Sequence, residues 1–275
     1  MYKILGKKVL NEQVTALTLD APFVARKVQP GQFVIIRTDE LGERIPLTVA
    51  DFDRDKGTLT IIFQAVGFTT KKLAAMNTGD SIADCVGPLG RATEFENPKK
   101  AIVIGGGVGC AIAYPQAKAL HNMGVYTDVI AGFRSRDIVI LEDEMKAVAD
   151  NLYITTDDGT YGEKGFVTDV LKRLIEKDSY DLVIAIGPIP MMKFVSKTTE
   201  PYGIRTLVSL NPIMIDGTGM CGGCRVTVGG ETKFACVDGP DFDGHKVDFD
   251  ELSRRNGFYR EEEAHACRME AALNG

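Results

Sequence analysis

The sequence has no excess of basic residues. Its 32 lysines and arginines are outnumbered by 38 aspartates and glutamates, which leaves a net charge of −6. A chain without a basic field does not attract phosphate backbones, so nucleic acid is not an expected partner. Long apolar runs are missing as well: the most apolar stretch, residues 101–115, is interrupted by glycines and is too short to span a bilayer.

Two further absences narrow the function. Lysines appear within the first eight residues, so the N-terminus lacks the apolar stretch of a signal peptide, and we expect a soluble, cytoplasmic protein without a membrane partner. Histidine is scarce, and none of His121, His245 and His265 stands in a motif with a serine or cysteine nucleophile. The sequence therefore offers no acid, base or nucleophile specific to one substrate.

The pattern of the 275 residues changes three times along the chain. Residues 1–97 carry short strand-like runs between turn signals, which predicts an antiparallel β-barrel. Residues 98–210 alternate strand, glycine turn and helix, which predicts a Rossmann-like α/β unit with a parallel sheet. Within it we expect helices over residues 141–149 and 167–177 and a strand over residues 182–186. Residues 211–247 are rich in glycine and cysteine, and a capping box at Asp248 opens a predicted helical tail over residues 248–275.

Cysteine spacing is the strongest chemical signal, in the pattern Asp216-x4-Cys221-x2-Cys224-x11-Cys236. Plant-type [2Fe–2S] proteins use Cys-x4-Cys-x2-Cys followed by a distant cysteine, so this spacing predicts a [2Fe–2S] site with aspartate as the first ligand. A zinc site and a turn role for Asp216 remain open, although no second Cys-x2-Cys or histidine pair follows. The other thiols are expected to be structural: Cys85, Cys110 and Cys267.

A glycine run at the end of a predicted strand indicates a nucleotide site in the α/β unit. Glycines before a helix N-terminus let a pyrophosphate approach bare amides. A second turn follows another buried strand, at the same edge of the sheet. Arg134, after a third strand, could reach a ribose 2′-phosphate together with Arg136, or both could lie in solvent, so the choice between NAD and NADP is open. The glycine run could also be a structural turn that binds no ligand. The predicted residues are Gly105, Gly106, Gly107, Val108, Gly109, Arg134, Gly187, Pro188 and Met191.

A third, weaker signal lies in the β unit. An arginine beside a strand can pair with a pyrophosphate, and a glycine followed by threonines can open a helix at a phosphate. A structural role is equally open on the residues alone, because Arg-x-Pro is common in loops. The residues concerned are Arg44, Pro46, Leu47, Thr48, Gly67, Thr69 and Thr70.

Together and in this order, the three segments resemble the ferredoxin reductase-like flavoproteins, and within them the electron-transfer subunits that carry FAD and a [2Fe–2S] cluster. The similarity covers essentially the whole chain. Two branches are similar: the small subunit of NADH-dependent reduced ferredoxin:NADP oxidoreductase, also called a sulfide dehydrogenase subunit, and the electron-transfer subunit of dihydroorotate dehydrogenase. Asp216 and residues 237–249 favour the first branch, since the second normally has cysteine as its first ligand. Thr69 departs from the glycine often found in the second branch.

The resemblance implies that FAD binds with its pyrophosphate near Arg44 and Thr70. Its ring is then expected near Pro46, Leu47, Thr48, Ile62, Phe63 and Gln64. NAD(H), or alternatively NADP(H), would exchange hydride with that ring, and the cluster would pass electrons to a larger flavin and iron–sulfur subunit in a heterodimer. In the favoured branch this partner performs electron bifurcation among NADH, NADPH and ferredoxin, so ferredoxin is an indirect partner. The dihydroorotate branch and a zinc-binding, non-enzymatic module remain alternatives.

Overall fold

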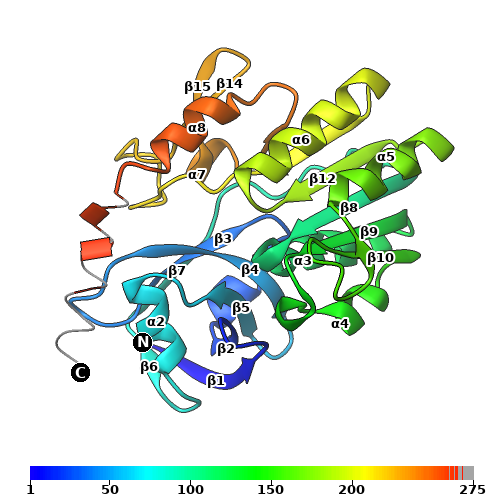
Figure 1. Ribbon diagram of the computed structural model, residues 1–275. Helices are drawn as coiled ribbons and strands as arrows, with labels where there is room; N and C mark the ends of the chain where they lie inside the picture. Colours follow the sequence, from blue (N-terminus) through cyan, green and yellow to red (C-terminus); the bar gives the residue numbers. More distant parts are fainter. Residues whose placement is uncertain (260, 263, 266–267, 269–275) are drawn as a thin grey trace.

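The chain folds into a β-barrel, an α/β sheet and a C-terminal segment that lies against both (Figure 1). The computed structural model describes residues 1–259, 261, 262, 264, 265 and 268. Within these residues no helix combines the length and the apolar character needed to cross a membrane.

The N-terminal strands form the predicted barrel, nearly closed and antiparallel throughout, in the order β6-β1-β2-β5-β4-β3-β7. Alternate residues of each strand fill the interior; in β5, for example, Leu59, Ile61 and Phe63 are buried while their neighbours face outward. The strands are β1 (Tyr2–Val9), β2 (Val14–Asp20), β3 (Phe33–Arg37), β4 (Ile45–Asp53), β5 (Thr58–Gln64), β6 (Ser81–Ile82) and β7 (Asp84–Leu89). The helices are α1 (Pro22–Ala25) and α2 (Phe68–Ala75).

The second unit is the predicted α/β sheet, in the order β11-β10-β9-β8-β12-β13-β16. Its strands are parallel except for the last, which pairs antiparallel with β13. The strands are β8 (Lys100–Gly106), β9 (Tyr126–Phe133), β10 (Asn151–Thr156), β11 (Glu163–Lys164), β12 (Leu182–Ile186) and β13 (Arg205–Ser209). The helices are α3 (Cys110–Asn122), α4 (Glu142–Lys146), α5 (Val167–Lys177) and α6 (Ile189–Thr199), with 3-10 turns η1 (Gly107–Gly109), η2 (Arg136–Ile138) and η3 (Glu200–Tyr202).

Helix α5 illustrates why these residues form these elements. Its buried side chains are Val167, Val170, Leu171, Leu174 and Ile175, which is the spacing of one helical face. The Asp169 carboxylate accepts a hydrogen bond from the backbone N–H of Phe166, 2.9 Å away, and so closes the first turn. The apolar face packs on the sheet and leaves the charged face in solvent.

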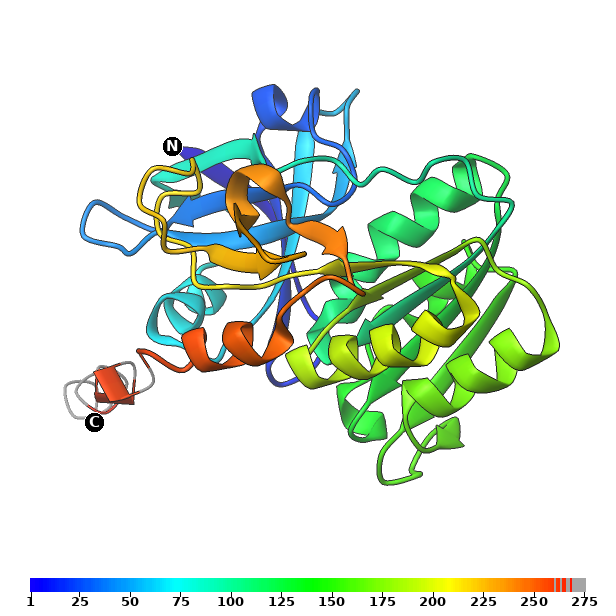
Figure 2. The same cartoon turned by 90° about the horizontal axis from the view of Figure 1, so that it is seen from above.

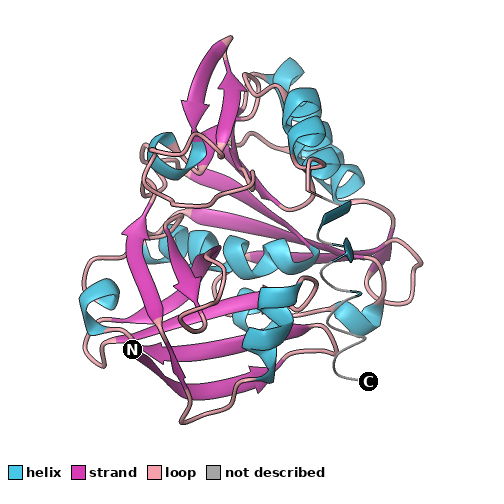
Figure 3. Cartoon of the chain, turned by 90° about the vertical axis from the view of Figure 1, so that its left-hand side faces the viewer, coloured by secondary structure: helices cyan, strands magenta, loops and turns pink. Residues whose placement is uncertain are grey.

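The C-terminal segment supplies one strand to the α/β sheet and packs on the barrel. It contains the hairpin β14 (Arg225–Val228) and β15 (Glu231–Phe234), the short helix α7 (Ala235–Asp238), β16 (Asp241–Asp243) and α8 (Phe249–Arg255). The hairpin projects at the top of Figure 3, and α8 lies beside α6 in Figures 1 and 2. Because β16 is the edge strand of the α/β sheet, this segment is part of the folded α/β unit. The boundaries between the units stay a prediction.

The carbonyl of Thr227, rather than Glu251, accepts the backbone N–H of Asp248 at 2.9 Å, so only the N-cap half of the predicted capping box is present at Asp248. The Asp248 side chain accepts hydrogen bonds from the backbone N–H groups of Asp250 and Glu251, at 3.1 and 2.8 Å, so α8 begins there. The rest of the tail predicted up to residue 275 lies partly outside the described residues, as does Cys267. The other two thiols expected to be structural, Cys85 and Cys110, are buried.

A buried polar cluster at the amino-terminal edge of the parallel strands gives a test of the fold. The Tyr180 hydroxyl donates to Asp128 Oδ2 at 2.5 Å, and Asn151 donates to Oδ1 of the same carboxylate at 2.8 Å. Burial raises the pKa of the Tyr180 hydroxyl, and the hydrogen bond to Asp128 raises it further, so this hydroxyl stays a donor.

We expect Tyr180→Phe to lower the free energy of unfolding by about 1–3 kcal/mol, because Asp128, 2% exposed, loses a donor. Denaturant unfolding measures this loss. The control is Tyr202→Phe, at a half-exposed tyrosine in η3, where the change should stay within about 0.5 kcal/mol. Equal losses in both variants would show that the Asp128 contact does not stabilise the sheet.

Candidate functional site

The loop before β14 holds three of the four predicted cluster ligands, and the fourth, Cys236, lies in α7. Three glycines of the loop have positive φ, +74° at Gly217, +85° at Gly219 and +70° at Gly222, which lets the backbone turn tightly. The Asp216 carboxylate accepts hydrogen bonds from the backbone N–H groups of Thr218 and Cys221, both at 2.9 Å. These bonds lower the pKa of Asp216, with the Thr218 bond the largest cause, so an anionic oxygen is held in this loop.

Two of the predicted sulfur ligands meet. The Sγ atoms of Cys224 and Cys236 lie 3.1 Å apart, both buried, and the Cys236 backbone N–H points at the Cys224 sulfur at 3.5 Å. Cys221 is exposed, and its sulfur accepts the N–H of Gly223 at 3.4 Å. Within the part of the chain that the structure describes, no three histidine, cysteine, aspartate or glutamate side chains lie close enough together to hold a metal ion.

The donor set nevertheless fits a metal cluster. Burial, with the neighbouring Cys224 as the next cause, raises the pKa of the Cys236 thiol to about 12, so the protein alone does not favour a thiolate there. A metal ion that coordinates a thiol removes its proton. Backbone N–H groups already aimed at two of the sulfurs are the contacts that sulfur ligands of a cluster receive. The four ligands remain a prediction.

The cluster loop rests on the outer face of barrel strand β3. A β-carbon at Gly217 would lie 3.0 Å from side-chain atoms of Ile35 and Leu89, so only glycine allows this approach. Phe33 and Ile35 share one hydrophobic core with Cys224 and Cys236. On the neighbouring strand β4, Thr48 pairs with Phe33 and Pro46 pairs with Ile35. The predicted flavin strand is therefore next to the strand that carries the cluster loop.

The predicted flavin residues lie where β4, β5 and α2 meet. Pro46, Leu47 and Thr48 are half-buried on β4; Ile62 and Gln64 face outward on β5, whereas Phe63 points into the barrel core. Arg44 is exposed, and its guanidinium lies 3.6 Å from Asp84. The Arg44 side chain is thus free to turn toward an anion at modest cost, because exposed ion pairs contribute little.

The turn before α2 uses its threonines internally. The Thr70 hydroxyl accepts the backbone N–H groups of Val66 and Gly67, at 3.1 and 3.0 Å. The Thr69 hydroxyl donates to Glu43 at 3.2 Å and is buried. Thr70 therefore stabilises the turn through hydrogen bonds within the protein. Its contact with a phosphate stays a prediction.

The predicted nucleotide residues come together at the carboxyl edge of the α/β sheet. Gly105 and Gly106 end β8, Gly107 to Gly109 form η1, and Val108 is half-buried. A β-carbon at Gly109 would lie 2.9 Å from Gly187 Cα, and one at Gly106 would lie 3.1 Å from Pro188 and 3.3 Å from the methyl carbon of Met191. Close packing of the two turns thus explains these glycines, while Gly107 faces open space.

The two arginines after β9 differ in their contacts. Arg134 is exposed, and its backbone carbonyl accepts the N–H of Asp158 at 3.2 Å. The guanidinium of Arg136 lies 5.3 Å from the centre of the Tyr161 ring, a cation–π contact. Arg134 remains the predicted nucleotide contact.

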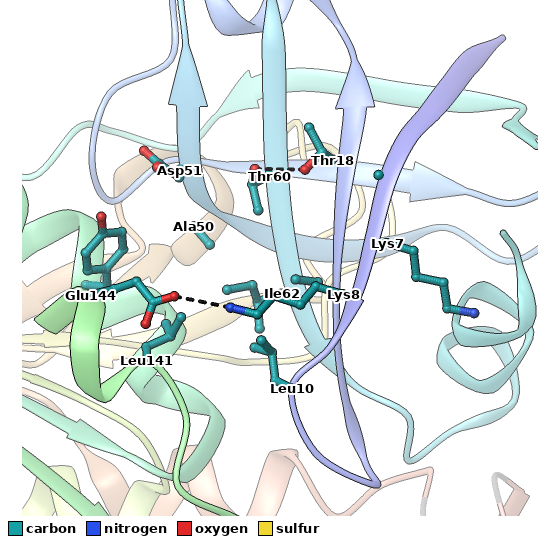
Figure 4. Close-up of a pocket in the computed structure, with 13 residues that line it drawn as sticks. Lys7, Lys8, Leu10, Thr18, Ala50, Asp51, Thr60, Ile62, Leu141 and Glu144 are labelled. Carbon is teal, nitrogen blue, oxygen red and sulfur yellow. Dashed lines mark hydrogen bonds and ion pairs between the residues drawn. The ribbon is translucent and has the colours of Figure 1, made fainter. Parts of the chain in front are cut away.

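Sequence reasoning missed a cavity of about 340 Å³ between the barrel and helices α3 and α4 (Figure 4). One ion pair joins two of its lining residues, Lys8 and Glu144, at 3.5 Å, and a third lining residue, Asp51, pairs with Lys118 at 2.7 Å. Ile62 is the one predicted flavin residue in its lining. No motif could have revealed it, because its walls come from distant segments. A second cavity, of about 320 Å³, adjoins Cys221 and is lined partly by Ile215, Arg255 and Phe258.

Comparisons with known proteins show the family to which this sequence and fold are similar. The family model for the iron-sulfur cluster binding domain of dihydroorotate dehydrogenase B matches residues 211–248. A Thermotoga maritima homologue of the electron transfer subunit of dihydroorotate dehydrogenase B (NAD(+)) is 48% identical, over 96% of this chain and 93% of that protein. A Clostridium beijerinckii protein from the adh 3′ region is 55% identical, over 97% and 93%.

One solved structure is similar over its full length. It is a chain of NADH-dependent reduced ferredoxin-NADP oxidoreductase, studied for flavin-based electron bifurcation. The identity is 46% and the TM-score 0.93, with 98% of this chain and 97% of that chain covered.

Proposed function

This chain belongs to the family of the dihydroorotate dehydrogenase B electron transfer subunits and their ferredoxin-NADP oxidoreductase relatives, and we propose that it moves electrons between NAD(H), FAD and a [2Fe–2S] cluster, to a larger partner subunit. The cofactors of the family are FAD and the cluster, and the redox role follows from them. The finer assignments, of residues to cofactors and of nicotinamide as the hydride source, are proposals.

The order of strands in the barrel is the observation that carries the proposal. Strand β4 lies between β5 and β3. The nucleotide turn η1 contacts β5, and the cluster loop packs on β3. A ring bound along β4 would therefore have the nucleotide site on one side and the cluster on the other. When bound, FAD supplies the conversion between two-electron hydride transfer and one-electron transfer.

The residues of this chain would bind the cofactors and orient them. Gly106, Gly109 and Gly187 let the two nucleotide turns pack closely, and Gly107 leaves amides open to a pyrophosphate. Pro46 and Thr48 would face the ring from β4. Asp216, Cys221, Cys224 and Cys236 would hold the cluster, with the buried pair Cys224 and Cys236 excluding water from one side.

We place the partner subunit at the cluster loop. Exposed apolar side chains gather around Cys221 there: Ile215 is 52% exposed, Met220 89% and Phe258 66%. Apolar groups exposed together mark an interaction surface. In the ferredoxin-NADP branch the partner would bifurcate electrons. The alternative is a dihydroorotate-oxidising partner, which the family model over residues 211–248 supports only as that of a near relative.

An anaerobic NADH titration of the purified chain tests the proposal. We expect the flavin absorbance to bleach and a paramagnetic signal of a reduced [2Fe–2S] cluster to grow with it. A colourless protein that contains zinc and no flavin would contradict it. With the partner added, NADPH oxidation that requires both NAD and ferredoxin favours the bifurcating branch, whereas reduction by dihydroorotate favours the other.

A further inference from the structure

A chain of hydrogen bonds joins all the units at a point away from the predicted ligands. The Thr93 hydroxyl, in the linker between β7 and β8, donates to Asp241 Oδ2 in β16 at 2.5 Å. The Thr93 hydroxyl oxygen in turn accepts the side-chain N–H of Gln116, in α3, at 2.7 Å. The backbone N–H of Thr93 donates to the carbonyl of Pro30, in a barrel turn, at 3.0 Å. Barrel, linker, nucleotide helix and cluster segment therefore meet at Thr93.

Two acceptors at this junction lack a donor. Among the described residues, Asp241 Oδ1 and Gln116 Oε1 are both inaccessible to solvent and have no hydrogen-bond partner. Buried acceptors without donors are rare in folded proteins. A proton on the Asp241 carboxyl turns one of these acceptors into a donor and removes a buried charge.

The surroundings of Asp241 favour the neutral acid. Burial raises the pKa of its carboxyl, opposed by the hydroxyls of Thr93 and Ser209. The charged groups of the elements packed around it bind elsewhere. Arg91 of the linker donates to the Val237 carbonyl, Arg205 of β13 pairs with Glu96, and Asp243 of β16 pairs with Lys246. Gly31, in the barrel turn, lies next to Asp241 and has no charged side chain to offer it; a β-carbon there would already lie 3.0 Å from Asp241 Oδ2.

We propose that Asp241, as a neutral carboxylic acid, is a positioning residue for electron transfer: through Thr93 and Gln116 it fixes the cluster segment relative to the helix that begins at the nucleotide turn. Four residues separate Asp241 from Cys236, and Gln116 lies in the second turn of α3. The inference rests on the proposed function, since it concerns the spacing between nucleotide, flavin and cluster. Misplacement of reacting groups by about 1 Å can cost roughly 100-fold in rate.

Replacement of Asp241 in the full chain with its cofactors tests the positioning role. After rapid mixing with NADH, we expect Asp241→Ala to slow reduction of the cluster by about tenfold, relative to bleaching of the flavin, with iron and FAD contents unchanged. Asp241→Asn should keep the normal rate, because its amide oxygen can still accept from Thr93 and the side chain is neutral. The control, Asp243→Asn in the same strand, should also be normal. Lower melting temperature in Asp241→Ala with an unchanged rate would overturn the positioning role.

The pH dependence of stability tests the neutral acid. A carboxyl whose pKa is raised on folding stabilises the folded state below its unfolded pKa, and this stabilisation is lost as the pH rises through the folded pKa. Over about pH 5 to pH 9, Asp241→Asn should therefore gain in melting temperature relative to the unmodified chain as the pH rises. Parallel curves would overturn the neutral state. This measurement needs no electron transfer, so it separates failure of the inference from failure of the proposed function.

Discussion

Replacing Cys224 by serine should remove most of the iron and acid-labile sulfide from the purified chain, while FAD stays bound. Cys224 is 1% exposed and its sulfur lies 3.1 Å from that of Cys236, so a serine there replaces a thiolate ligand by a poor one. NADH should still bleach the flavin of this variant, but the paramagnetic signal of the reduced cluster should be absent. Iron, sulfide and FAD assays on the same sample measure the effect.

The matched control for this prediction is Cys85→Ser. Cys85 is buried to the same degree, 1% exposed, but its thiol lies in the barrel, where burial alone raises its pKa to about 12. It should lose some stability and keep its full iron content. Equal iron in both variants would contradict the assignment of the cluster to residues 216–236. Zinc in place of iron would instead revive the alternative left open by the spacing.

The fold could be predicted because its strongest signals are local. The helix over residues 167–177 and the strand over residues 182–186 have the predicted bounds, since period and burial agree in both. The helix expected over residues 141–149 is shorter, Glu142–Lys146, and Leu141 before it has a φ of +57°. Helix α6 was not predicted, because the sequence at Pro188 was interpreted as a turn; Pro190 lies in the first turn of this helix, where proline is tolerated.

The contacts between units could not be predicted, because they join residues far apart in sequence. Strand β16 has three residues and exists through its pairing with β13. Nothing near Thr93 in the sequence indicates its bond to Asp241, 148 positions away. The glycines at positions 105–109 were predicted as a turn for a ligand, whereas the structure shows that Gly109 is also required for packing against Gly187. A motif gives the chemistry of a site, but its spacing from the next site depends on tertiary packing.

Replacing Gly107 by alanine should raise the KM for NADH by about tenfold or more while leaving the fold intact. Gly107 has a φ of +56°, and a β-carbon there would meet no protein atom within 4 Å. The added methyl group would instead occupy the space through which a pyrophosphate approaches the amides of η1. Steady-state reduction of an artificial acceptor by NADH measures KM and kcat separately.

Gly124, just after the C-terminus of α3, provides the control for Gly107→Ala. Its φ is +74°, and a β-carbon there would also meet no atom within 4 Å. Both variants should therefore lose a similar free energy of unfolding, about 1–2 kcal/mol for a side chain in the left-handed region. Only Gly107→Ala should lose affinity for NADH. If the two variants share the same KM, the open space beside Gly107 does not receive the nucleotide, and the turn would be structural. A difference in KM at matched stability would place the pyrophosphate at the N-terminus of α3, next to β5 and hence on the side of β4 opposite the cluster loop.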